Sequence, residues 1–115
     1  MVKLLTIILF FPLMMSCATN KKLKAVNEMP ACLQTMINTM AAEPNGLPQS
    51  VARYTYNKQT VYYMVSPCCD KYNVVYDSDC NILGYPDGGI TGRGNGRMID
   101  FKTDASDEKL IWSKE

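Results

Sequence analysis

Oxygen-bearing side chains and glycine are concentrated in residues 85–101, which read YPDGGITGRGNGRMIDF. This segment holds five of the seven glycines in the chain. Calcium takes about six to eight oxygen ligands, and glycine turns expose backbone carbonyls that can join side-chain oxygens. We expect no cofactor, and calcium is the alternative, with Asp87, Asn95 and Asp100 as ligands and Asp104 as a further oxygen donor.

The same segment has the features of a loop that binds through its backbone and its arginines. We take Gly88, Gly89, Arg93 and Arg97 as the candidate binding loop. N–H groups in such a loop can form a small anion nest. A phosphate cradle would need a helix directly after the glycines, and no helical pattern follows Gly96. The interpretation that we prefer over both is a tight, ordered loop that covers a sheet edge or the end of a core, with glycine where φ is positive.

Four of the five cysteines lie in the body of the chain, at Cys32, Cys68, Cys69 and Cys80. An even number in a small exported chain indicates a disulfide framework. Zinc and thioredoxin-like chemistry are disfavoured, because the chain has no histidine and no Cys-x-x-Cys spacing. A bond between the adjacent Cys68 and Cys69 would be strained, because the Cα atoms of adjacent residues lie about 3.8 Å apart, below the usual ~4.4–6.8 Å of a disulfide. We therefore expect Cys32 to pair with one member of the doublet and Cys80 with the other, in either order.

Residues that commonly perform catalysis are scarce. Histidine is absent, and no motif supports a Ser–Lys pair. The carboxylates of Asp77 and Asp79 are close in sequence, but they lie in a predicted turn, where solvation is their ordinary role. The sequence therefore predicts that the protein is not an enzyme.

The elements that would position these residues begin with a helix over residues 29–46. Leu33, Met36, Ile37 and Met40 follow the spacing of one apolar stripe, and the Pro-Asn-Gly at residues 44–46 ends it. The stripe is typical of core packing, with a soft methionine-rich binding face as the alternative.

From residue 51 the apolar period changes to two. Residues 51–66 predict a hairpin, 73–77 a third strand and 81–85 a short fourth strand. Leu110-Ile111-Trp112 predicts a last strand or a docked tail, preceded by a solvated acidic turn with Asp104, Asp107 and Glu108. The expected fold is α+β: one N-terminal helix packed on a small antiparallel meander of about four strands, stapled by disulfides.

The N-terminus has the pattern of an export signal. Lys3 precedes an apolar run over residues 4–15, which is shorter than the ~20 residues that a bilayer span needs and has the length of a secretory signal. A buried core helix is the alternative for this run. It ends in Ser16-Cys17, which resembles the lipobox of bacterial lipoproteins, where cleavage precedes a cysteine that is then acylated, for example with palmitate. Simple secretion is the alternative to this lipid anchor.

The predicted organisation is therefore a signal peptide at 1–16, an acylated Cys17 with a polar tether at 17–28, and a single domain at 29–115. Without Lys3, basic and acidic residues balance, which argues against a nucleic-acid partner. The expected partner is the membrane, through the lipid anchor.

Two stretches together resemble a known family. YTYNKQTVYYMVSPCCDKYNVVYD is a tyrosine-rich hairpin followed by Cys-Cys-Asp, and PDGGITGRGNGRMIDF carries the Gly-Gly-x-x-Gly-x-Gly-x-Gly loop. Over residues 30–112 the chain is similar to a family of small Bacteroidetes-type lipoproteins whose shared domain has no assigned function. In such lipoproteins an acidic run after the cysteine resembles a surface-export signal, and none follows Cys17. The resemblance implies a periplasm-facing location in the cell envelope.

These observations lead to one expected function and two alternatives. We expect a membrane-anchored, non-catalytic envelope lipoprotein that serves recognition or structure, with an unidentified envelope protein or ligand as partner. The first alternative is an inhibitor of an envelope or host enzyme that acts through the glycine loop. The second is a calcium- or small-ligand-binding module.

Overall fold

The computed structural model describes residues 28–68 and 70–115. The predicted signal peptide, Cys17 and nearly all of the tether, as well as Cys69, lie outside the described residues. In the described part of the chain, no helix is long and apolar enough to cross a membrane.

The N-terminal helix α1, Ala31–Ala41, confirms the predicted helix with a shorter span. Its buried side chains are Leu33 and Ile37, which belong to the predicted apolar stripe. Asn45 has a positive φ of 53° and helps to reverse the chain after the helix. Gly46 packs so closely against the helix end that an added Cβ would lie 2.2 Å from the Met40 carbonyl oxygen. The helix therefore ends in a compact turn that leads into the sheet.

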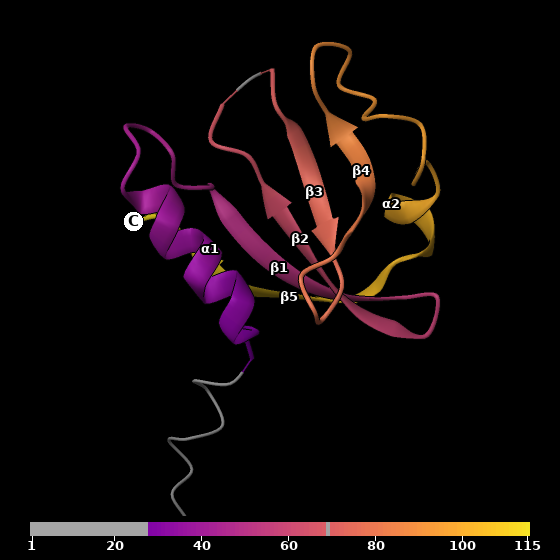
Figure 1. Ribbon diagram of the computed structural model, residues 1–115. Coiled ribbons are helices and arrows are strands. Elements are labelled where there is room, and N and C mark those ends of the chain that lie inside the picture. Colours follow the sequence, from indigo (N-terminus) through magenta and orange to yellow (C-terminus); the bar gives the residue numbers. More distant parts are fainter. Residues whose placement is uncertain (1–27, 69) are drawn as a thin grey trace, which may run out of the picture.

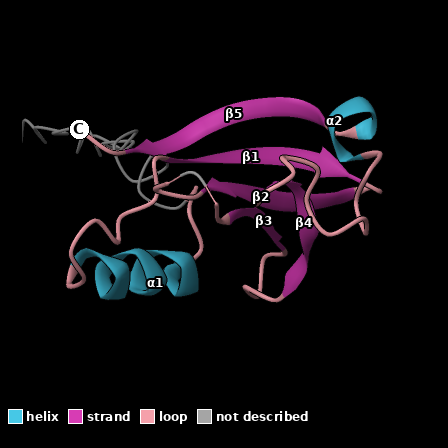
Figure 2. Ribbon diagram, turned by 90° about the horizontal axis from the view of Figure 1, so that it is seen from above, coloured by secondary structure: helices cyan, strands magenta, loops and turns pink. Residues whose placement is uncertain are grey.

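Five antiparallel strands form one sheet with the order β4-β3-β2-β1-β5. They are β1 Ser50–Tyr56, β2 Gln59–Val65, β3 Tyr72–Tyr76, β4 Ile82–Gly88 and β5 Ser106–Ser113. The β1–β2 hairpin turns at Asn57 and Lys58, which both have positive φ, as a tight two-residue turn requires. Figure 1 shows the strands side by side with α1 alongside, and Figure 2 shows α1 along one side of the sheet. This arrangement confirms the predicted α+β class.

The fifth strand corrects one detail of the prediction. Asp107 and Glu108 lie inside β5 and not in a turn before it, and Asp104, also assigned to that turn, is the last residue of the short helix α2, Phe101–Asp104. The strand is at the edge of the sheet, and only Ile111 and Trp112 in it are half-buried. Register shifts against β1 and a positive φ of 57° at Asp107 interrupt its alternation. Apolar and polar residues therefore do not alternate along β5, and this alternation is the pattern by which a strand is predicted from sequence.

The sheet carries a hydrophobic core on each face. Under α1 lie Leu33, Ile37, Val51, Tyr62, Met64 and Tyr76. On the other face lie Tyr56, Val61, Val75, Met98 and Phe101. Phe101 begins the short helix α2, Phe101–Asp104. Because β4 and β5 are at opposite edges, the segment between them must cross a face of the sheet, and its Met98 and Phe101 form part of the second core.

The disulfide pairing expected from the sequence is wrong for Cys32 and Cys80, which bond to each other with a Cα–Cα distance of 6.2 Å. The topology gives the reason. Cys32 lies in the first turn of α1 and Cys80 in the β3–β4 turn, whereas Cys68 precedes β3. The five residues of β3, about 16 Å of strand, therefore separate Cys68 from Cys80. Cys68 is also disulfide-bonded.

Candidate functional site

The glycine loop, residues 88–97, folds back along the edge strand β4. The Gly94 N–H donates to the Gly88 carbonyl over 3.1 Å, and the Asn95 N–H donates to the Tyr85 carbonyl over 3.1 Å. Gly94 has a φ of 66°, and an added Cβ would lie only 1.9 Å from the Tyr85 oxygen. Backbone contacts at this distance require glycine. The loop covers an edge that would otherwise expose unpaired backbone groups.

The outer side of the glycine loop carries exposed apolar and basic side chains. Ile90 is 90% exposed and Ile99, just after the loop, is 79% exposed. Arg93 and Arg97 are exposed as well. In Figure 1 the loop after β4 lies at the top of the domain, whereas α1 begins at the bottom. The loop therefore lies far from the N-terminal end of the described chain.

Beneath the loop, Asp87 is the buried charged residue of the described chain, with 8% exposure. The Tyr63 hydroxyl donates to Oδ1 and Oδ2 of Asp87, each over 2.9 Å, and Asn73 Nδ2 donates to Oδ1 over 2.9 Å. Lys102 Nζ, from α2, lies 2.6 Å from Oδ2. We call Tyr63, Asn73, Asp87 and Lys102 the Asp87 network. It joins β2, β3, β4 and α2 at one carboxylate.

Electrostatics keep the Asp87 carboxylate ionised. Burial raises its pKa, but the hydrogen bonds from Lys102, Asn73 and Tyr63 outweigh burial and hold the pKa below its usual value. Burial and the bond to Asp87 raise the pKa of Tyr63. Burial, together with hydrogen bonding to Glu108, raises the pKa of nearby Tyr54 to about 12. These tyrosines are therefore neutral donors at neutral pH.

The three candidate calcium ligands each have different hydrogen-bond partners. Asp87 belongs to the network above. Asp100 Oδ1 accepts the Tyr56 hydroxyl over 2.7 Å, and Asn95 Oδ1 accepts the Arg97 N–H over 3.2 Å. Within the described residues, no group of three acidic or cysteine side chains is placed to hold a metal ion. Calcium binding at Asp87, Asn95 and Asp100 stays an untested alternative.

The predicted loop residues have structural partners of their own. Gly88 pairs with Arg93 in an isolated bridge. The Gly89 N–H donates to the Lys71 carbonyl over 3.0 Å, and an added Cβ at Gly89 would meet the Tyr72 ring at 2.6 Å. Arg93 lines a shallow pocket of about 320 Å³ together with Ile99 and Lys102. Arg97 is exposed at the end of the loop. Sequence reasoning missed Tyr63, Asn73 and Lys102, because no spacing links positions so far apart.

The aromatic rings next to the Asp87 network hold α2 on the sheet. The Phe101 ring lies 5.2 Å from that of Tyr54, 5.4 Å from Tyr56 and 5.7 Å from Tyr63, measured between centroids. A pocket of about 430 Å³ opens beside them and is also lined by Glu108.

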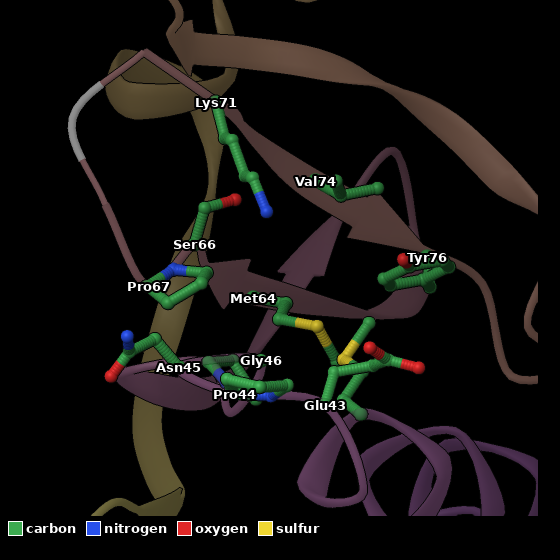
Figure 3. Close-up of a pocket in the computed structure, with 12 residues that line it drawn as sticks. Glu43, Pro44, Asn45, Gly46, Met64, Ser66, Pro67, Lys71, Val74 and Tyr76 are labelled. Atoms are coloured by element: carbon green, nitrogen blue, oxygen red, sulfur yellow. The ribbon is translucent and has the colours of Figure 1, made fainter.

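A third pocket, on the α1 face, has a volume of about 420 Å³. It lies between the turn that follows α1, the end of β2 and the start of β3. Met64, Val74 and Tyr76 line it from the sheet, and Lys71 and Glu43 supply its charged groups (Figure 3).

Comparison with family models matches residues 38–114 to the family described as Domain of unknown function (DUF6970), and the chain belongs to this family. Comparison with curated proteins and with solved structures gives no match.

Proposed function

We propose that this member of the DUF6970 family is a lipid-anchored, non-catalytic domain of the cell envelope that recognises a protein partner through its glycine loop. The observation that carries the proposal is the loop itself. It is fixed to β4 by backbone hydrogen bonds, yet it presents Ile90, Arg93 and Arg97 to solvent. A loop that is already ordered loses little conformational entropy on binding.

The proposed anchor rests on the N-terminal sequence. The apolar run and Ser16-Cys17 support cleavage before Cys17 and acylation of its thiol. One acyl chain binds a membrane only marginally, so stable attachment needs further acyl chains or basic residues, and Lys21, Lys22 and Lys24 follow Cys17. In this arrangement the glycine loop, which lies far from the start of α1, would face away from the membrane. We propose that the anchored domain lies on the periplasm-facing side of the envelope.

The non-catalytic part of the proposal is supported by the roles that the polar groups already have. Asp87 is held by three side chains, and Asp100 accepts a hydrogen bond from Tyr56. These contacts connect β1, β2, β3, β4 and the segment around α2, which is a structural role. The same rigid loop favours a second, narrower candidate, an inhibitor that inserts residues 88–97 into the cleft of an envelope or host enzyme.

The anchor is tested with the variant Cys17→Ser in cells that make the protein. The unaltered chain should incorporate radiolabelled palmitate and sediment with membranes. The variant should take up no label and lose its membrane attachment. Label in the variant, or a soluble unaltered chain, would contradict the anchor.

The loop is tested by placing a photo-crosslinking amino acid at residue 90 or, as a control, at residue 82. Ile82 is 54% exposed at the opposite end of β4. A discrete crosslinked protein should form from position 90 and not from position 82. It should disappear with Gly94→Ala, which would push a Cβ against the Tyr85 carbonyl oxygen. It should persist with Gly92→Asn, because no atom lies within 4 Å of a Cβ added at Gly92 and asparagine tolerates its positive φ of 72° better than most residues. Equal crosslinking from both positions, or none from position 90, would contradict the proposal. Assaying the captured partner, if it is an enzyme, separates inhibition from simple recognition.

A further inference from the structure

The pocket of about 420 Å³ on the α1 face has a floor that belongs to the hydrophobic core. Met64 and Tyr76 are 3% and 6% exposed and are members of the core cluster under α1, while Val74 packs against that cluster. Pro48, which is fully buried, and Met40 also line the pocket. The pocket therefore opens onto the hydrophobic core and is not a surface depression between polar side chains.

The pocket exists because α1 ends before it has covered the whole face of the sheet. After Ala41 the chain turns at residues 43–46, and Gly46 returns it tightly against the helix end. Met64 near the end of β2 and Val74 in β3, which are cross-strand partners, line the pocket next to this turn. The opposite wall is the β2–β3 connection, which contributes Ser66, Pro67 and Lys71.

Lys71 places a positive charge over this apolar floor. Figure 3 shows its side chain reaching from the rim into the space above Met64, with the amine directed inward. Its backbone is fixed at both ends, because its N–H donates to the Cys68 carbonyl over 3.3 Å and its carbonyl accepts the Gly89 N–H over 3.0 Å. Within the described residues, no salt bridge engages the Lys71 ammonium.

Glu43 lies on the other side of the pocket, across from Lys71 in Figure 3. An anionic group would therefore be attracted to the Lys71 end and repelled from the Glu43 end. Pockets of about 300–1,000 Å³ with apolar walls and a few polar groups are typical of small-molecule sites. The charge arrangement selects a ligand with one anionic head and an apolar body.

We propose that this pocket binds a small amphipathic monocarboxylate, with its carboxylate on Lys71 and its apolar chain over Met64, Val74 and Tyr76. The site is distinct from the glycine loop, and the proposal does not depend on the lipid anchor or on the loop partner.

The test uses residues 17–115 with Cys17→Ala, a chain that includes the helices and strands that the structure describes. Its methionine methyl groups are labelled with ¹³C and followed by NMR during titration with octanoate up to about 10 mM, ten times the Kd of a weak ~1 mM site. The Met40 and Met64 signals should move together and saturate. The Met98 signal should stay in place, because Met98 lies in the core on the other face. Stationary Met40 and Met64 signals, or an equal movement of Met98, would overturn the proposal.

Charge recognition is tested with matched ligands and variants. Lys71→Gln should raise the Kd for octanoate about tenfold to hundredfold, the effect of losing one charge-assisted hydrogen bond. Lys58→Gln, in the β1–β2 turn, should leave the Kd unchanged. Octanol has the same apolar chain without the charge and should bind at least about tenfold more weakly than octanoate. Octylamine binding better than octanoate would assign the charged group of the site to Glu43 and overturn the role of Lys71.

Discussion

The α1 face of the sheet and the face that carries α2 differ in what holds their covering segments in place. On the α1 face an eleven-residue helix packs Leu33 and Ile37 onto the strands, and the Cys32–Cys80 disulfide ties its first turn to the β3–β4 turn. On the other face the covering segment is the crossover from β4 to β5. It contains only a four-residue helix, which cannot be stable by itself.

That second cover depends on side-chain bonds that converge from several elements. Lys102 and Asp87 link α2 to β4, Tyr56 and Asp100 link β1 to the residue before α2, and Phe101 packs among three tyrosine rings. The α1 face is thus closed by apolar burial and a covalent bond, and the α2 face by a charge network and aromatic packing. We expect loss of the disulfide to loosen the α1 face, and loss of the Asp87 charge to loosen the α2 face.

The largest expected effect comes from removing the disulfide of the α1 face. Cys32→Ala with Cys80→Ala opens a link between residues 48 positions apart. In the chain-entropy model this lowers the free energy of unfolding by about 4 kcal/mol. The measurement is denaturant unfolding under oxidising conditions. Methyl NMR should show the Met36 and Met40 signals broadening while Met98 is unchanged. A loss below about 1 kcal/mol, or broadening confined to Met98, would contradict the assignment of this link to the α1 face.

The next effect comes from Asp87→Asn, which breaks the charge network of the α2 face. Lys102 has a side-chain exposure of 66%, so its ion pair contributes little, and most of the effect comes from the buried bonds to Tyr63 and Asn73. We expect a loss of about 2–4 kcal/mol in the free energy of unfolding.

The matched control for this variant is Asp79→Asn, an exposed carboxylate in the β3–β4 turn, which should change stability by less than about 0.5 kcal/mol. Met98 should be perturbed in Asp87→Asn while Met36 and Met40 keep their signals. Equal effects of the two substitutions would remove the distinction between the faces.

A smaller and reversible effect is expected in acid. Because the folded-state pKa of Asp87 is lowered, its contribution is fully present above the unfolded-state value near 3.8 and is lost as the pH falls through the folded-state pKa. Unfolding measured from neutral pH to about pH 2 should therefore show stability falling below about pH 4. Asp87→Asn should flatten this acid limb. Asp77, whose pKa is lowered chiefly by its bond to the Asn81 backbone, should account for part of the slope that remains. An unchanged acid limb in Asp87→Asn would contradict the role given to the network.

The two faces also differ in how much of them the sequence could predict. The α1 face follows from local patterns: the apolar spacing that buries Leu33 and Ile37, the turn at residues 44–46 and the hairpin at Asn57 and Lys58. These signals are short in range and each has a known backbone consequence. The cysteine pairing could not be derived in this way, because it depends on which end of β3 each cysteine lies beside.

The α2 face depends on relations that no local pattern contains. Tyr63, Asn73 and Asp87 meet through the pairing of β2, β3 and β4, and Lys102 joins them because the crossover from β4 to β5 lies over this face. The glycines predicted an ordered loop over a sheet edge, and the contact between Gly94 and the Tyr85 carbonyl agrees with it. Asp87 was taken from the sequence as a metal ligand because its carboxylate lies beside glycines, and its hydrogen-bond partners are far away in the chain.

The smallest expected effect is that of calcium, and it bears on what the α2 face is for. A calcium ion at the predicted site would have to compete for Asp87 with Tyr63, Asn73 and Lys102, for Asp100 with Tyr56, and for Asn95 with the backbone of Arg97. Calcium binds about six to eight oxygens, so it would repay the loss of these bonds only if the loop were rebuilt around it.

We therefore expect the melting temperature to change by less than about 2 °C between EDTA and millimolar calcium. A ligand at about 100 times its Kd adds roughly 2.7 kcal/mol, which in a domain of this size raises the midpoint by some ten degrees or more. A rise of that size would contradict our expectation and establish calcium binding. Its loss in Asp87→Asn, but not in Asp79→Asn, would then place the ion at the network, whose carboxylate would act as a ligand and not as the clamp of the α2 face.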